Sequence, residues 1–196
     1  VPVVGNAMTT VLLTVGSLTV AEDGTTIDTT PDVGETNVTL NQFKLSAGST
    51  EAVTVESITA LKAGTAAVTD TTNIELYDVT HSKSLGTAAA WDSEEKATWA
   101  NLGLVIGKGE SLRLKIMDDV VGGVASTALT VNADIVDGTD TLVDAKGNVY
   151  GFYITVAEGS YSGKGAANQT INAGALNLSK SSSSPATGKI SAGSDV

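Results

Sequence analysis

The chain has 196 residues, which corresponds to about one domain, and 41% of them are hydrophobic, too many for a disordered chain. With 11 basic and 22 acidic residues the net charge is −11, so a nucleic-acid-binding protein, which needs a basic surface, is excluded. Cysteine is absent and His81 is the only histidine, which excludes disulfides, thiol nucleophiles and most histidine-based zinc sites. No apolar run reaches the roughly 18 residues of a membrane-spanning helix, so no membrane insertion is expected.

The choice of residues predicts β-strands throughout the chain. The 21 glycines stand against 3 prolines, and threonine, valine and serine are abundant, as is typical of all-β proteins. Apolar and polar residues alternate in residues 110–117, where Arg113 and Lys115 separate leucines and an isoleucine, and half-buried antiparallel strands have this pattern. About nine strands are expected, at residues 10–20, 37–46, 52–61, 73–78, 97–106, 110–117, 126–136, 148–156 and 170–178.

Two local irregularities are expected within this series of strands. The alternation slips by one residue between Leu40 and Phe43, which predicts a β-bulge at Asn41-Gln42. Residues 88–99 are expected to contain a short helical turn, because their acidic cluster resembles the start of a helix.

The strands and their glycine-containing turns favour an all-β fold, a two-sheet antiparallel β-sandwich of the Ig-like or jelly-roll-like kind. Residues 1–178 are expected to form this single domain. Residues 16–20 and 174–178 are similar to each other, and the similarity continues beyond both segments at the same spacing. Residues 179–196 are therefore interpreted either as a serine-rich tail or as the start of a next repeat.

Most of the chain between residues 16 and 136 has segments of alternating threonine and aliphatic residues in a characteristic order. These segments are 16–20, a linker with threonine and proline, 37–40, 43–47, 53–59, 65–70, 73–78 and 109–115. They resemble β-sandwich repeat modules of prokaryotic extracellular surface proteins, which form surface layers, adhesins or filaments. The resemblance implies an extracellular or cell-surface location; residues 137–172 match it less well.

Calcium is the metal that the acidic residues favour. The cluster between residues 134 and 144 follows an expected strand and offers the hard oxygen ligands that Ca²⁺ prefers, although its spacing is not that of an EF-hand. The candidate ligands are Asp134, Asp137, Asp140 and Asp144. The alternative interpretation is a set of solvated acidic turns, and no other cofactor is expected.

Catalysis is not expected from this sequence. His81 lies between expected strands, without the Gly-x-Ser-x-Gly motif of a serine hydrolase, so a solvated loop histidine is the simpler interpretation. Trp91 and Trp99 are interpreted either as core residues or as the aromatic platform of a glycan-binding surface. Three Asn-x-Ser/Thr sequons, at Asn37, Asn168 and Asn177, are candidate glycosylation sites.

The two terminal regions carry apolar side chains on strands that invite pairing with another chain. A strand that is apolar on both faces is costly at a free edge, so it favours pairing or burial. The candidate assembly residues are Val11, Leu13, Val15, Leu18, Val20, Leu176 and Leu178. The expected function is a non-enzymatic extracellular subunit that assembles with copies of itself by exchange of terminal strands. The alternative is an adhesive or carbohydrate-binding module of a larger surface protein, with glycans as partners.

Overall fold

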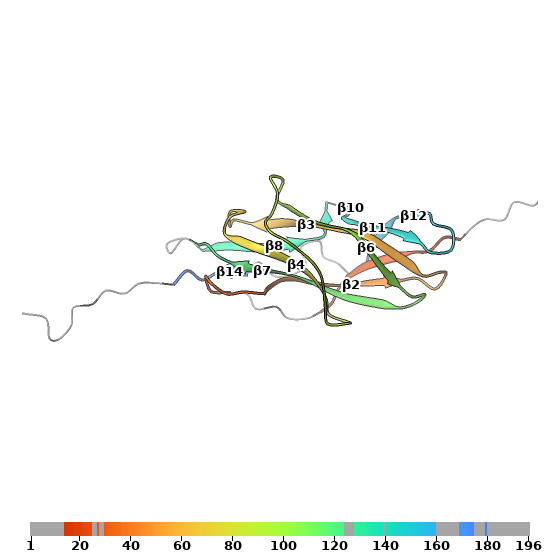
Figure 1. Ribbon diagram of the computed structural model, residues 1–196, viewed down its shortest axis with the longest axis horizontal. Coiled ribbons are helices and arrows are strands. Elements are labelled where there is room, and N and C mark those ends of the chain that lie inside the picture. Colours follow the sequence, from red (N-terminus) through yellow and green to blue (C-terminus); the bar gives the residue numbers. More distant parts are fainter. Residues whose placement is uncertain are drawn as a thin grey trace, which may run out of the picture.

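The computed structural model describes residues 14–24, 27, 30–123, 128–138, 140–159, 169–174 and 179. Within these residues the protein is all-β and two sheets pack against each other, which confirms the all-β, two-sheet part of the expected fold class (Figure 1). No helix in the described part is long and apolar enough to cross a membrane.

The first sheet has six strands in the order β13-β1-β2-β7-β4-β5. Its neighbours are antiparallel, except that β1 and β13 are parallel. The strands are β1 (Leu18–Glu22), β2 (Val38–Ala47), β4 (Thr71–Asp78), β5 (Lys83–Ala88), β7 (Ser111–Val120) and β13 (Val156–Glu158).

The second sheet is built around the long strand β3 (Val53–Gly64). On one side β3 pairs with β6 (Lys96–Ile106), and on the other side it pairs first with β11 (Val143–Gly147) and then with β8 (Leu129–Asp134). Two short strands complete this sheet: β12 (Tyr153–Ile154) beside β11, and β14 (Gln169–Ile171) beside β8. A separate two-stranded hairpin consists of β9 (Val136–Asp137) and β10 (Asp140–Thr141).

The core lies between the sheets because alternate side chains of each strand point inward. Fully buried aliphatic and aromatic side chains from both sheets, such as Phe43, Ile58 and Leu114, meet there. Each such side chain stabilises the fold by about 1.5–3 kcal/mol on burial. Trp91 and Trp99 are each only 5% exposed, so the interpretation as core residues is confirmed and neither is available as a glycan platform.

The strands differ in detail from the expected series. The bulge in β2 is confirmed one residue early: its register with β7 shifts between Thr39 and Asn41, so Leu40 is the additional residue. In place of a helical turn, Asp92 Oδ1 accepts hydrogen bonds from the backbone N–H of Glu94 (2.8 Å) and Lys96 (2.9 Å) and closes a tight turn. The described residues form 14 strands, so the count of about nine is not confirmed.

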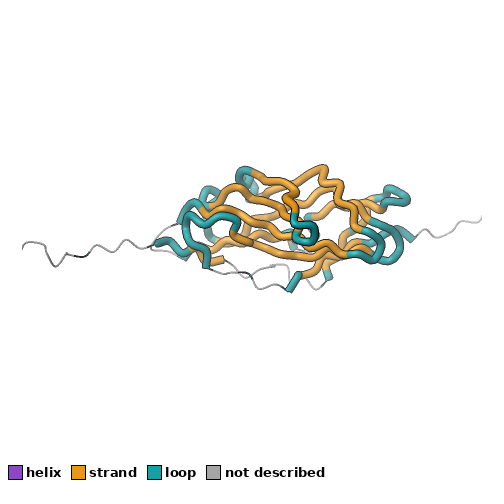
Figure 2. Tube along the Cα trace, turned by 60° about the horizontal axis from the view of Figure 1, so that its bottom comes forward, coloured by secondary structure: helices purple, strands orange, loops and turns teal. Residues whose placement is uncertain are grey.

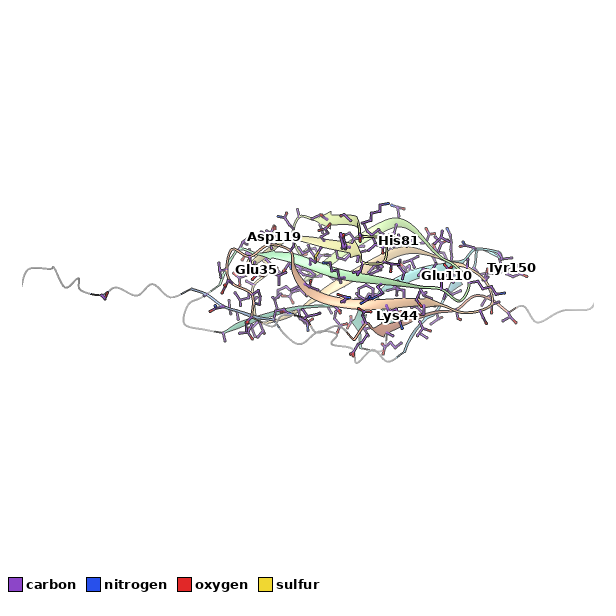
Figure 3. The ribbon with its side chains drawn as sticks, turned by 90° about the horizontal axis from the view of Figure 1, so that it is seen from below. Glu35, Lys44, His81, Glu110, Asp119 and Tyr150 are labelled. Atoms are coloured by element: carbon purple, nitrogen blue, oxygen red, sulfur yellow. The ribbon has the colours of Figure 1, made fainter. Side chains whose placement is uncertain are left out.

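The molecule is elongated, and many of its connecting loops gather at the two ends of the sandwich (Figure 2). We call one the hairpin end, formed by the turns at residues 48–52 and 107–110 and by the β11–β12 connection. The other, which we call the acidic end, is formed by residues 30–37, 65–70 and 118–123. Figure 3 shows Tyr150 and Glu110 toward the hairpin end, and Glu35 and Asp119 toward the acidic end.

Candidate functional site

Exposed aromatic side chains are concentrated in one loop at the hairpin end. Val149, Tyr150, Phe152 and Tyr153 are 67%, 51%, 56% and 74% exposed. We call this group the aromatic hairpin. It holds three aromatic residues in a chain whose aromatic content is only 4%. Large apolar side chains exposed together, and not singly, mark interaction surfaces.

The loop itself is closed by backbone hydrogen bonds. The N–H of Gly147 donates to the carbonyl of Phe152, and the N–H of Gly151 donates to the carbonyl of Gly147, each at 3.0 Å. Gly151 adopts a positive φ of 71°, a conformation that is strained for residues with a Cβ atom. The aromatic side chains are therefore presented on a closed turn.

A buried carboxylate joins the aromatic hairpin to the N-terminal part of the described chain. Glu51 is 4% exposed. Its Oε1 accepts a hydrogen bond from the N–H of Gly16, and its Oε2 accepts one from the N–H of Val149, each at 2.7 Å. A Cβ atom added at Gly147 would lie 2.4 Å from Glu51 Oε1, so only glycine fits there without a shift. Gly16 therefore lies beside the aromatic hairpin.

One row of side chains crosses the outer face of the second sheet near this end. In the pairing register, Val105 lies opposite Thr54, Thr54 opposite Lys146, and Lys146 opposite Tyr153. Val105 is 62% exposed. Lys146 Nζ is 2.7 Å from Glu56 Oε1, and the hydrogen bond to Glu56 raises the pKa of this lysine. The exposed surface of this row mixes apolar groups with a paired charge.

The acidic end has a different chemistry. The segments that form it contain no lysine or arginine and five carboxyl groups, three in loops and two at the end of β7: Asp32, Glu35, Asp70, Asp118 and Asp119. Val33 and Val121 are exposed there, at 40% and 52%. The backbone joins these loops, since the N–H of Gly34 donates to the carbonyl of Val120 at 2.8 Å. This end therefore combines negative charge with two small apolar groups.

Asp119 organises two residues with left-handed backbone at this end. Its Oδ1 accepts a hydrogen bond from the N–H of Asn37 at 2.9 Å, and its Oδ2 accepts one from Asn73 Nδ2 at 2.8 Å. Asn37 and Asn73 have φ values of 58° and 53°. Asparagine tolerates this region better than most residues with a side chain.

Asp118, the neighbour of Asp119, points into the core and is 1% exposed. Burial raises its pKa to about 7; the nearby hydroxyl of Thr71 opposes this shift, and the charge of Asp119 adds to it. Thr71 Oγ1 also accepts a hydrogen bond from Trp91 Nε1 at 2.8 Å. A buried carboxyl group with this pKa changes its charge near neutral pH.

His81 lines a pocket that reaches the 107–110 turn of the hairpin end. Its Nδ1 is 2.7 Å from Oδ2 of the buried Asp78, so one ring nitrogen is occupied by a carboxyl group. Ser111, which also lines the pocket, shares a hydrogen bond of 2.8 Å with Ser46. The pocket has a volume of about 340 Å³ and is lined by Thr80, His81, Val105, Ile106, Glu110, Ser111 and Leu112. Among the described residues no hydroxyl group hydrogen-bonds to His81, so the pair lacks the contact that would activate a nucleophile.

The candidate calcium ligands lie in different surroundings. Asp134 is buried and its Oδ1 accepts a hydrogen bond from the N–H of Val136 at 3.0 Å. Asp144 is exposed on β11 and accepts a hydrogen bond from Ser57 Oγ at 2.7 Å. Asp137 is exposed and pairs through its backbone with Asp140, whose side chain lies outside the description. The part of the chain that the structure describes contains no group of three or more residues suited to hold a metal. Calcium binding stays a prediction.

The candidate assembly residues divide into two groups. Leu18 and Val20 are fully buried on β1, in the chain's own sheet between β2 and β13. Val15 is 40% exposed, just before that strand. The others lie outside the described residues: Val11, Leu13, Leu176 and Leu178. Leu18 and Val20 therefore lie in the chain's own sheet, and the assembly role of the candidate residues stays a prediction.

Of the candidate glycosylation sites, Asn37 is exposed at the acidic end. Asn168 and Asn177 lie outside the described residues. Glycosylation stays a prediction.

The aromatic hairpin was not anticipated as a surface feature, because residues 148–156 alternate like a strand. Gly151 and the three aromatic residues around it are the signal that could have revealed it. No protein-family model matches the sequence, and no curated protein is significantly similar to it.

Proposed function

We propose that this protein is a non-enzymatic, extracellular structural subunit that assembles with copies of itself into a filament or surface layer. The observation that carries the proposal is the position of the two ends of the described chain. Gly16 is held at the hairpin end by Glu51. Asn172 is held at the acidic end, where its carbonyl accepts a hydrogen bond from the N–H of Val33 at 3.2 Å. Segments that leave a subunit at opposite ends suit head-to-tail contacts, which do not close and so give filaments.

The edges of the sheets support strand exchange as the mode of assembly. On one side of the sandwich, the sheets end in β12, β13 and β14, of two, three and three residues. On the opposite side they end in β5 and β6, of six and eleven residues. Within the described residues this side is built from short strands, which suits the addition of a strand of another subunit by backbone hydrogen bonds along the sheet, as in donor-strand complementation.

We extend the proposal to the type of sandwich, the location, the partners and the calcium site of the subunit. The sandwich is of the Ig-like or jelly-roll-like kind, as in the surface-protein modules that the sequence resembles. The acidic composition and the exposed sequon at Asn37 suit a cell-surface location. The partners are copies of the chain, and calcium, if bound, would be held by the acidic turn around Asp137.

The test is deletion of residues 1–13, which leaves all of β1 in place. We expect this variant to stay folded and monomeric, whereas the full chain forms polymers in negative-stain micrographs. Deletion of residues 1–20 would remove Leu18 and Val20 from the core and so confuse assembly with stability. Normal polymers from the variant, or a monomeric full chain at high concentration, would contradict strand exchange.

A second candidate function is an adhesive or carbohydrate-binding module. The observation in its favour is the aromatic hairpin, because exposed tyrosine and phenylalanine rings can stack on sugar rings. A monodisperse protein that binds glycans, and loses that binding on the substitution Tyr153→Ser, would favour this alternative.

A further inference from the structure

We infer that the aromatic hairpin of one copy docks on the acidic end of the next copy, as the rigid contact of a head-to-tail assembly. The inference rests on the proposed function, since it names the surfaces that meet once subunits line up. It does not require that strands be exchanged.

The aromatic hairpin has the properties of a preformed contact. Tyr153, Phe152 and Tyr150 are all more than half exposed, and the turn beneath them is closed by the backbone hydrogen bonds of Gly147 and Gly151. Aromatic residues dominate the binding energy of protein interfaces, and a contact already held in shape loses little conformational entropy on docking.

The position of the hairpin indicates that its occupant is a copy of this chain. Glu51 holds the N–H of Gly16 and the N–H of Val149 on its two oxygens, so the chain before Gly16 and the aromatic side chains share one end. The described part of the chain begins at Thr14, two residues before Gly16. A neighbour that receives the chain before Gly16 must approach the aromatic hairpin directly.

The acidic end complements the hairpin in the chemistry of its exposed groups. It offers exposed Val33 and Val121 for the aromatic rings. It also offers the carboxyl groups of Asp32 and Glu35, which suit the phenol hydroxyls of Tyr150 and Tyr153, because hydrogen bonds to ionised acceptors are the stronger kind.

Charge and symmetry favour contact between a hairpin end and an acidic end over contact between two like ends. The acidic end presents four exposed or half-buried carboxyl groups, those of Asp32, Glu35, Asp70 and Asp119, and its residues 30–37, 65–70 and 118–123 include no lysine or arginine, so two acidic ends would repel. The 107–110 turn of the hairpin end carries one exposed charge of each sign, on Lys108 and Glu110, so the charge of this turn does not repel an acidic end as a second acidic end would. Two hairpin ends could bury aromatic rings together, but such a symmetric contact closes at a dimer and leaves both acidic ends unused.

Disulfide trapping tests the contact directly, because the native chain has no cysteine. Tyr150→Cys and Val121→Cys are made in separate proteins, mixed in equal amounts and oxidised mildly, and the linked products are identified by mass spectrometry. Ser84→Cys, at an exposed position on β5, replaces Val121→Cys in the control mixture. We expect the Tyr150–Val121 pairing to exceed the control pairing about tenfold or more. A dominant link between two Tyr150→Cys chains, or pairing at the control level, would overturn the inference.

A second variant separates this inference from strand exchange. Phe152→Ser combined with Tyr153→Ser removes two exposed rings and leaves the segment before Gly16 intact. We expect the concentration needed for assembly to rise about tenfold or more, with an unchanged melting temperature. Assembly at the wild-type concentration would overturn the docking surface while strand exchange stands. Loss of the Tyr150–Val121 pairing in this variant supports docking even where deletion of residues 1–13 has no effect on polymers.

Discussion

Each end of the molecule buries a carboxyl group, and the two groups differ in the hydrogen-bond donors that surround them. At the hairpin end, both oxygens of Glu51 accept backbone N–H groups, at 2.7 Å each. At the acidic end, Asp118 faces the core near the hydroxyl of Thr71, and burial raises its pKa to about 7. The carboxyl group of Glu51 therefore joins two backbone segments, whereas that of Asp118 makes the stability of the fold depend on pH. The number of donors aimed at the carboxyl group makes the difference, and not its burial alone.

The largest effect on the free energy of unfolding is expected from removal of the Glu51 carboxyl group. Glu51→Ala leaves the buried N–H of Gly16 and the part-buried N–H of Val149 without their acceptor, and a buried unpaired donor costs about 1–3 kcal/mol. We expect the free energy of unfolding to fall by about 2–4 kcal/mol in urea titrations. Glu110→Gln, at an exposed site of the same end, should change it by less than about 0.5 kcal/mol.

Glu51→Gln tests how much of this loss comes from each of the two hydrogen bonds. Its amide oxygen can still accept one of the two N–H groups, so an intermediate loss of stability is expected. If Glu51→Ala were as stable as the wild type, the hydrogen bonds of Glu51 would not stabilise the hairpin end.

A smaller effect, limited to one pH range, is expected at Asp118. Its folded-state pKa of about 7 lies above the ordinary value of 3.8. Its contribution to stability is therefore fully present below about pH 4 and is lost as the pH rises through 7. Relative to Asp118→Asn, which stays neutral, the wild type should lose about 2–3 kcal/mol between pH 5 and pH 8.

Urea titrations of both proteins at several pH values measure this difference. Comparison with Asp118→Asn cancels the titration of the other carboxyl groups. A difference that stays constant across the range would show that Asp118 does not titrate near neutral pH in the folded protein.

The smallest effect concerns backbone strain beside Asp119. Asn37 has a φ of 58°, so Asn37→Ala is expected to lower the free energy of unfolding by about 1 kcal/mol. Asn37→Gly should be nearly neutral, because glycine has no Cβ atom. Both variants remove the sequon, so a glycan, where present, is lost from both. Equal stability of the two variants would refute the role of backbone strain.

Local patterning was sufficient to predict the strands whose side chains alternate cleanly. Residues 37–46 and 110–117 became β2 and β7, and the slip near Leu40 marked a real bulge. Residues 83–88 carried no such alternation, because β5 lies at an edge and is exposed or half-buried along its length. This strand is recognisable only from its pairing with β4.

The same patterning failed at the aromatic hairpin. Phe152, Ile154 and Val156 alternate in sequence as though on one buried face. In the structure Phe152 is 56% exposed, whereas Val156 is 6% exposed. The chain turns back at Gly151 to pair with β11 and then crosses to β1, so the three side chains do not share an environment. Alternation predicts which residues share a face of a continuous strand, but not where the strand stops.

The sequence by itself determined the all-β class, the acidic surface and the burial of alternating aliphatic residues, because these properties follow from composition and from period-two geometry. Tertiary structure alone decided that Leu18 and Val20 belong to the chain's own core. It also brought Glu51 to Gly16, 35 positions away, and to Val149, 98 positions away. Contacts at such separations depend on how whole strands order and register across two sheets, and a local pattern of apolar and polar residues does not specify that order.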